Sequence, residues 1–104
     1  VLAYCNTEDE VIEAAKDADG IINQYAPITR RVIESLKRCK VIARYGVGVD
    51  NIDVEAATEH KIIVANVPDY CVDEVSTHTI ALILACARGI TLLDRKIRDK
   101  KWDG

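Results

Sequence analysis

Two glycines near the middle of the sequence, Gly46 and Gly48, mark the segment whose residue types could do chemistry. Neither glycine has a side chain beyond Cα, so a ligand can come close to the backbone at both positions. A loop that presents successive backbone N–H groups forms a concave binding site for an anion. Residues 44–53 could therefore bind a small anion such as a carboxylate. A plain structural turn is the alternative interpretation of the same residues.

The spacing of these glycines also begins the dinucleotide-binding pattern Gly-x-Gly-x-x-Gly, but the pattern is not completed. Its sixth position is Asn51 rather than glycine. The pattern further requires a long helix after the loop and an acidic residue about 20 positions later. Here a short helix is predicted instead, from Asp53 to His60. We therefore reject a dinucleotide phosphate site at this loop.

The elements that must position the loop are short apolar segments that alternate with helical patterns. Strands separated by helices of about ten residues favour right-handed crossovers and a parallel sheet. The apolar runs are continuous, which is typical of strands that are covered on both faces. The glycine loop follows the third strand, at the carboxyl edge where open parallel sheets bind ligands. Strands are predicted at residues 1–4, 20–23, 40–45 and 61–66.

Three helix starts can be predicted from the side chains that would cap them. Thr7 and Glu10 match a capping box, in which each side chain accepts a hydrogen bond from the backbone N–H of the other residue. Thr29 is a suitable N-cap for the second helix, and Asp53 for the third. Gly20 follows the first helix and ends it.

A longer helix is predicted for residues 72–88, and its composition differs from that of the others. Residues 79–87 carry no charge, and their apolar side chains point to several sides of the helix. A helix that is apolar all round must be covered all round, so we expect another domain or a second subunit to pack on it. Gly89 interrupts the helix, and the charged residues 94–101 are interpreted as a solvated helix face rather than a nucleic-acid site.

Length, charge and cysteine spacing restrict the classes of function. The chain has 104 residues, one domain at most, and its net charge of -3 argues against nonspecific binding to nucleic acid or an anionic membrane. No apolar run reaches the roughly 18–20 residues that cross a bilayer.

Methionine is absent, so we expect the chain to start inside a longer protein. The four cysteines complete no metal-binding pattern, so we expect no metal site. Because the chain shows no secretory feature, we interpret them as small buried hydrophobic residues with free thiols in a reducing cytoplasm.

Residues 41–58 and 62–68 together resemble the D-2-hydroxyacid dehydrogenase family. This family includes D-3-phosphoglycerate dehydrogenases, glyoxylate reductases, formate dehydrogenases and the C-terminal-binding-protein corepressors. Residues 69–75 are most similar to the branch with the corepressors and their bacterial enzyme relatives. The resemblance implies the substrate-side domain of an NAD-dependent oxidoreductase that interconverts a D-2-hydroxy acid and its 2-keto acid, with D-3-phosphoglycerate dehydrogenase as one candidate. The alternative is a dinucleotide-sensing, corepressor-like binding protein of the same fold.

The resemblance also implies an α/β fold: a flavodoxin-like parallel sheet with flanking helices, incomplete because the first strand–helix unit and the Rossmann cofactor domain are absent. Residues 1–99 would form a partial substrate-binding (catalytic) domain, and residues 100–104 would begin the linker to the absent NAD-binding domain. In a flavodoxin-like order the first strand lies inside the sheet, so its absence leaves a gap. The catalytic Arg, Glu and His of the family belong to the cofactor domain. We therefore expect no catalytic residue, and no dehydrogenase activity, in this chain alone.

In the family, backbone amides of the glycine loop hold the substrate carboxylate, a role that falls on Val47 and Gly48 here. The position of Val47 also lies beside the nicotinamide of NAD. By the same resemblance, Asn66 lies near the substrate and Val75 touches the cofactor. The alternatives are that Asn66 only caps the turn before Pro68 and that Val75 is core packing. The implied partners are a small 2-hydroxy or 2-keto acid, the NAD-binding domain of the same chain, and a second subunit in a homodimer.

Three further positions bear on substrate and proton chemistry. Many family members have an acidic residue at the position of Thr77, which this sequence lacks. The neighbouring His78 is interpreted as a packed or interface residue rather than a catalytic base. A phosphorylated substrate needs basic residues, and Arg44 either serves that purpose or pairs with an acid on the surface.

Overall fold

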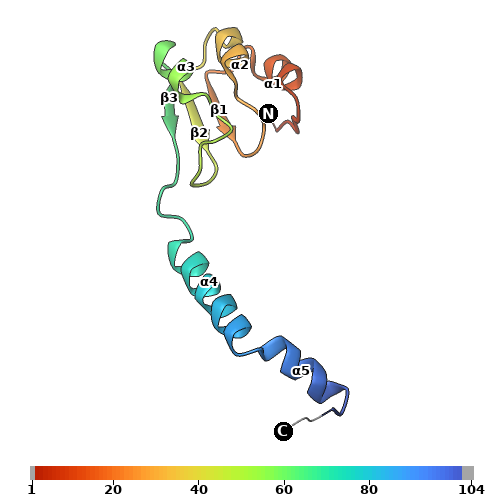
Figure 1. Cartoon of the computed structure of the whole chain (residues 1–104). Helices are drawn as coiled ribbons and strands as arrows, with labels where there is room; N and C mark the ends of the chain where they lie inside the picture. Colours follow the sequence, from red (N-terminus) through yellow and green to blue (C-terminus); the bar gives the residue numbers. More distant parts are fainter. Residues whose placement is uncertain (1, 102–104) are drawn as a thin grey trace. The chain divides into compact units, whose positions relative to one another are not determined.

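A computed structural model describes residues 2–101, and the chain divides into two compact units, unit 1 (Val1–Tyr70) and unit 2 (Cys71–Gly104) (Figure 1). Helices and strands alternate in unit 1, whereas the regular structure described in unit 2 is helical. The elements of unit 1 are α1 (Glu8–Ala15), β1 (Gly20–Asn23), α2 (Arg30–Ser35), β2 (Val41–Arg44), α3 (Val54–Glu59) and β3 (Ile63–Ala65), and those of unit 2 are α4 (Val72–Ala87) and α5 (Ile90–Arg98).

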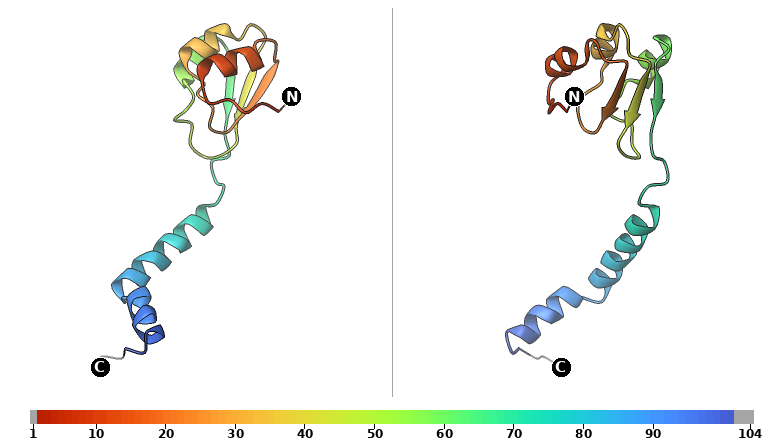
Figure 2. Two further views of the ribbon diagram at one scale, coloured as in Figure 1. Left: turned by 90° about the vertical axis from the view of Figure 1, so that its right-hand side faces the viewer. Right: turned by 180° about the vertical axis from the view of Figure 1, so that it is seen from behind.

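The strands of unit 1 form a parallel sheet in the order β1-β2-β3, which confirms the predicted α/β architecture. The register places Ile21, Ile42 and Val64 side by side on one face of the sheet. Helices α1, α2 and α3 lie on one side of the sheet (Figure 2), and these three residues face that side, where they belong to or pack against the core. The core between sheet and helices is built from fully buried apolar residues: Ile28, Val32, Ile33, Ile42, Ala56 and Ala57.

The opposite face of the sheet is open within unit 1, so the prediction that both faces are covered is wrong for this unit. On that face the side chains of Ile22 and Ile63 are 83% and 67% exposed. The reason is that every helix of unit 1 crosses on the same side of the sheet (Figure 2). The continuous apolar character of the strands therefore marks a second surface that unit 1 does not bury itself.

Residues 2–6 have no regular secondary structure, so the strand predicted for residues 1–4 is wrong over the part that the structure describes; Val1 lies outside that part. A strand needs a neighbour for its backbone N–H and C=O groups, and the sheet ends at β1. An open hollow of about 1000 Å³ lies between residues 2–6, helix α1 and β1. Its position beside β1 agrees with the gap predicted for an incomplete flavodoxin-like sheet.

The helices of unit 1 begin at the capping side chains predicted from the sequence. In the capping box of α1, the N–H of Glu10 donates to Thr7 Oγ1 at 3.3 Å, and the N–H of Thr7 donates to Glu10 Oε2 at 3.0 Å. Thr29 and Asp53 cap α2 and α3, each by accepting a hydrogen bond from a backbone N–H of the first turn. These bonds satisfy N–H groups that a helix start leaves without a partner.

Helix α4 of unit 2 exposes apolar side chains around its circumference. Ile80, Leu82, Ile83 and Leu84 are 55% to 60% exposed, and unit 2 buries no residue of this helix. Gly89, with φ +59°, separates α4 from α5 as predicted. Neither of these helices alone is long and apolar enough to cross a membrane. Only when joined across their 59° bend do they meet that test of length and composition.

Candidate carboxylate-binding loop

The glycine loop, residues 45–50, leaves the carboxyl end of β2 as predicted. Gly46 has φ +151°, a conformation that residues with a side chain rarely adopt. A Cβ atom at this position would also lie 3.0 Å from Nη1 of Arg44. Gly48 has no such backbone requirement, although a Cβ atom there would lie 3.1 Å from Oδ2 of Asp50. Gly46 is therefore needed for the shape of the loop, and Gly48 keeps space open beside it.

Two carbonyl groups of the glycine loop are held by donors at the exit of β3. The backbone N–H of Val67 donates to the Gly46 carbonyl at 3.1 Å, and Nδ2 of Asn66 donates to the Val47 carbonyl at 2.7 Å. In a trans peptide the C=O and the N–H that follows it point in opposite directions. The N–H groups of Val47 and Gly48 therefore point away from the exit of β3.

These two N–H groups donate no hydrogen bond within residues 2–101. Both residues are exposed, and the side chain of Val47 adds an apolar surface next to the amides. Adjacent N–H groups that face outward form a concave anion site, and each can donate to one oxygen of the same carboxylate. The geometry therefore makes the glycine loop capable of binding a carboxylate.

Asn66 lies at the exit of β3, and its side-chain amide contacts the glycine loop rather than the turn before Pro68. The structure thus brings Val47, Gly48 and Asn66 together at the carboxyl edge of the sheet. Val75 belongs to α4 in unit 2, where it is 62% exposed. Core packing within unit 2 therefore does not explain this valine.

The side chain of Arg44, at the end of β2, places a cation next to the glycine loop. Its guanidinium lies over the ring of Tyr25, with Cζ 5.7 Å from the ring centroid, and Nη1 donates to the Tyr45 carbonyl. Its Nε is buried and has no hydrogen-bond partner in the described part of the chain. Within the same part no carboxylate forms an ion pair with Arg44, so the surface ion pair considered above is not observed. Acidic partners are present at the other arginines of unit 1: Arg30, Arg31 and Arg38.

Two asparagines that were not predicted as site residues tie the glycine loop to β1. Asn23, the last residue of β1, is 3% exposed, which is unusual for a polar side chain. Its Oδ1 accepts a hydrogen bond from Nδ2 of Asn51 at 2.7 Å, and its carbonyl accepts one from the N–H of Tyr45 at 2.7 Å. One feature of the sequence could have pointed to Asn23. It is a polar amide at the end of an apolar strand, at the carboxyl edge where parallel sheets bind ligands.

Several ionisable groups of unit 1 have shifted pKa values because of helix caps and ion pairs. The hydrogen bond from Arg30 lowers the pKa of Glu59. The backbone N–H groups that bond Glu10 lower the pKa of that carboxyl, and burial raises the pKa of the Cys39 thiol. Among residues 2–101, no group of three His, Cys, Asp or Glu side chains is arranged to hold a metal ion.

In unit 2, the two positions that depart from the family pattern lie on α4. Thr77 Oγ1 donates to the Asp73 carbonyl at 2.7 Å, so its hydroxyl is used within its own helix. His78 is exposed, so it is not a packed residue within unit 2. An interface role for His78 stays a prediction.

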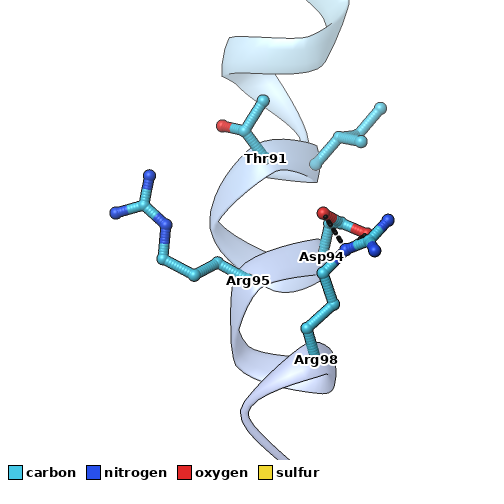
Figure 3. A pocket seen from close by; sticks show the side chains of 5 residues that line it. Thr91, Asp94, Arg95 and Arg98 are labelled. Carbon is cyan, nitrogen blue, oxygen red and sulfur yellow. Dashed lines mark hydrogen bonds and ion pairs between the residues drawn. The ribbon is translucent and has the colours of Figure 1, made fainter.

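A shallow hollow of about 450 Å³ lies on α5 and is lined by side chains of that helix alone (Figure 3). Arg98 Nε donates to Asp94 Oδ2 at 2.9 Å along the helix, so this pair is already satisfied. Within residues 2–101, no second element of unit 2 encloses the hollow. The charged residues of its lining, Asp94, Arg95 and Arg98, are exposed, as predicted for residues 94–101. We do not regard it as a ligand site.

A parallel α/β sheet with a loop at its carboxyl edge that is capable of binding an anion is typical of the ligand-binding domains of α/β enzymes. Residues 3–95 match the family described as D-isomer specific 2-hydroxyacid dehydrogenase, catalytic domain. The chain therefore belongs to this family, as the resemblance of the glycine-loop region implied.

Individual relatives agree with the family assignment. The D-3-phosphoglycerate dehydrogenase of Methanocaldococcus jannaschii is 47% identical over 98 residues, which is 93% of this chain and 19% of that protein. The solved structure of an acyclic imino acid reductase in complex with NADPH and D-Arg has a TM-score of 0.87 and 30% identity, over 94% of this chain and 32% of that one. The solved structure of the NAD+-bound 3-phosphoglycerate dehydrogenase of Entamoeba histolytica has a TM-score of 0.67 and 36% identity, over 77% of this chain and 26% of that one. This chain thus spans a third or less of the length of each of these proteins.

Proposed function

We propose that this chain is the substrate-binding part of a longer, two-domain, NAD-dependent dehydrogenase that interconverts a D-2-hydroxy acid and its 2-keto acid. The observation that carries the proposal is the pair of outward, unpaired N–H groups at Val47 and Gly48, in a chain of this family. The substrate-binding domain would comprise residues 1–99. Residues 100–104 would begin the linker to the NAD-binding domain, and residues 102–104 lie outside the described part.

In this proposal the glycine loop binds and orients the substrate. Each carboxylate oxygen accepts a hydrogen bond from one of the two N–H groups, at Val47 or Gly48. Because C2 is bonded directly to the carboxylate carbon, fixing the carboxylate also fixes the carbon at which hydride is exchanged. The carboxylate keeps its charge in both the hydroxy acid and the keto acid, so the loop can hold substrate and product alike. Proton transfer is assigned to the family's Arg, Glu and His, outside this chain.

The cofactor proposed for this protein is NAD, which when bound supplies or accepts the hydride. The exposed side chain of Val47 offers an apolar surface suited to the nicotinamide ring, and we propose Val75 of unit 2 as a second apolar contact. The glycine loop does not complete the dinucleotide pattern, so the pyrophosphate would be held by the NAD-binding domain.

The proposal extends to partners and location. The apolar side chains around α4 are exposed and need to be buried by another surface. We propose that the NAD-binding domain of the same chain and a second subunit of a homodimer pack against them. All four cysteines are unpaired, which suits a reducing cytoplasm. The prediction that they are buried is correct for Cys39 alone, because Cys5 and Cys71 are half-buried and Cys86 is exposed on α4.

For the substrate we propose an acid with a second anionic group, such as 3-phosphoglycerate. The support for this choice is Arg44, a cation beside the glycine loop that has no acidic partner within residues 2–101. Guanidinium groups bind phosphate through several N–H donors at once, and they keep their charge at neutral pH. A substrate without a second anionic group, such as glyoxylate, would leave this cation unused.

The test compares Arg44→Met with the unaltered intact enzyme in NADH oxidation. We expect kcat/KM for 3-phosphohydroxypyruvate to fall about tenfold or more, the size of a lost charged hydrogen bond, with a much smaller fall for glyoxylate. Equal losses for both substrates would contradict the phosphate assignment. An unaltered intact enzyme that oxidises NADH with neither substrate would overturn the proposed activity.

The similarity of residues 69–75 to the corepressor branch supports a second candidate, a dinucleotide-sensing binding protein of the same fold. The same assay separates the two candidates. An intact protein that binds NADH tightly but turns over no 2-keto acid would favour the binding protein.

A further inference from the structure

Asn23 holds both ends of the glycine loop. At the entrance, the N–H of Tyr45 donates to the Asn23 carbonyl at 2.7 Å. At the exit, Nδ2 of Asn51 donates to Asn23 Oδ1, also at 2.7 Å. Residues 46–50 lie between these two attachment points, so one buried residue of the neighbouring strand closes the loop.

The exit of the loop is also fixed to the turn that follows β1. Nδ2 of Asn51 and Nδ2 of Asn23 both donate to the Ala26 carbonyl, each at 2.9 Å. The N–H of Ile28 donates to the Asn51 carbonyl at 2.8 Å. Because Asn23 is almost completely buried, water cannot easily replace these partners, and an amide left unpaired there would be strongly unfavourable.

We propose that Asn23 and Asn51 are positioning residues for the carboxylate site, and that they act by closing the loop that presents the N–H groups of Val47 and Gly48. With both ends fixed on β1, the donors at the exit of β3 can hold the loop carbonyls and direct these N–H groups outward. Neither asparagine side chain donates to the ligand itself. The inference deepens the proposed function and rests on it.

The hydrogen bonds within the pair are asymmetric, and this asymmetry provides the test. Nδ2 of Asn51 faces oxygens only: Asn23 Oδ1 and the carbonyls of Gln24 and Ala26. Asn51→Asp would therefore place a carboxylate against oxygens and force the loop exit away from β1. Asn23→Asp instead keeps an acceptor for Asn51 and replaces its own bond to Ala26. Because position 23 is almost completely buried, the new carboxyl should also lower the Tm.

The experiment measures KM, kcat and thermal unfolding of the intact enzyme with a 2-keto acid, and the Kd values of oxamate and NADH. In Asn51→Asp we expect KM and the oxamate Kd to rise about tenfold or more, with the NADH Kd changed less than about twofold. Asn23→Asp should show a smaller rise in the same two quantities. Asn6→Asp, the same chemical change on an exposed residue outside the loop, is the matched control and should leave KM, kcat and both Kd values unchanged. Its Tm is not compared, because the backbone N–H of Asn6 bonds Glu10 at the start of α1.

The outcomes separate this inference from the proposed function. A lower Tm with unchanged KM and oxamate Kd in Asn51→Asp would show a purely structural role and overturn the inference alone. Should Asn51→Asp not fold, Asn51→Ala removes the amide without adding charge, and unchanged oxamate affinity in that variant would overturn the inference equally. An unaltered enzyme that binds no oxamate would overturn both the inference and the proposed function.

Discussion

Gly46 and Gly48 are equivalent in the sequence pattern, but the structure gives them different roles. Gly46 has a positive φ, and an added Cβ would meet the guanidinium of Arg44. Gly48 has no such backbone requirement, and its N–H is one of the two that face outward. A side chain at position 46 should therefore act mainly on the stability of the loop. A side chain at position 48 should act mainly on the approach of the ligand.

Gly48→Val in the intact enzyme tests this distinction. We expect kcat/KM for a 2-keto acid to fall about tenfold or more, because the new side chain fills the space beside the N–H groups that we propose to bind the carboxylate. Gly46→Ala is the comparison, and it should lower the unfolding free energy by about 1 kcal/mol or more. Steady-state kinetics and thermal unfolding measure the two effects. Unchanged kinetics in a folded Gly48→Val variant would remove Gly48 from the site.

The sequence was sufficient to find the glycine loop but not the asparagines that fix it. The loop is recognised from residues that are adjacent in the chain, Gly46 and Gly48. The bond between Asn23 and Asn51 joins residues 28 positions apart. It depends on the register between β1 and β2, which no local pattern encodes. Side chains that position a site from a neighbouring strand are therefore found only once the sheet is known.

At the scale of helices and strands, the helix starts that were predicted from local interactions are confirmed. Thr7, Thr29 and Asp53 cap their helices because a cap joins residues only a few positions apart. The strand predicted for residues 1–4 is not formed over the described residues, because a strand needs a neighbour. The hollow beside β1 shows where such a neighbour would fit.

Removal of the first helix cap should destabilise unit 1. We expect Thr7→Ala to lower the free energy of unfolding by about 1 kcal/mol, because the N–H of Glu10 loses its acceptor at the helix start. Thr58→Ala on α3 is the matched control, since its hydroxyl bonds a carbonyl within the helix and caps nothing. Urea unfolding followed by circular dichroism measures both variants. Equal effects in the two variants would contradict a specific role for the cap.

The second half of the same capping box makes stability depend on pH. The N–H groups of Asn6 and Thr7 lower the pKa of Glu10 below the ordinary value of a glutamate carboxyl, which the unfolded chain would have. A carboxyl with a lowered pKa stabilises the fold above the unfolded pKa, and this stabilisation is lost as the pH falls through the folded pKa. Unfolding free energies measured from pH 6 to pH 3 should therefore fall more steeply for the unaltered chain than for Glu10→Gln. If the unfolding free energies of the two chains change equally with pH, protonation of Glu10 does not affect the stability of the fold.

At the scale of the whole molecule, each of the two units exposes apolar surface that it does not bury itself. In unit 1 one face of the sheet is open, and in unit 2 the circumference of α4 is exposed. The need for cover on α4 was predicted from the uncharged residues 79–87 alone, because an amphipathic helix would have shown a polar side. The surface that packs against α4 could not be predicted, because it belongs to another domain or subunit.

The uncovered surface of α4 should make the isolated chain self-associate. Exposed apolar patches of this kind drive association in water, so we expect the 104-residue chain to form concentration-dependent oligomers in size-exclusion chromatography with light scattering. A chain that ends at Tyr70 keeps the open sheet face but lacks α4, and it should associate less at the same concentration. Equal association of the two chains would assign the effect to the open sheet face of unit 1. If the 104-residue chain stays monomeric, the apolar surface of α4 does not drive association by itself, and the prediction is contradicted.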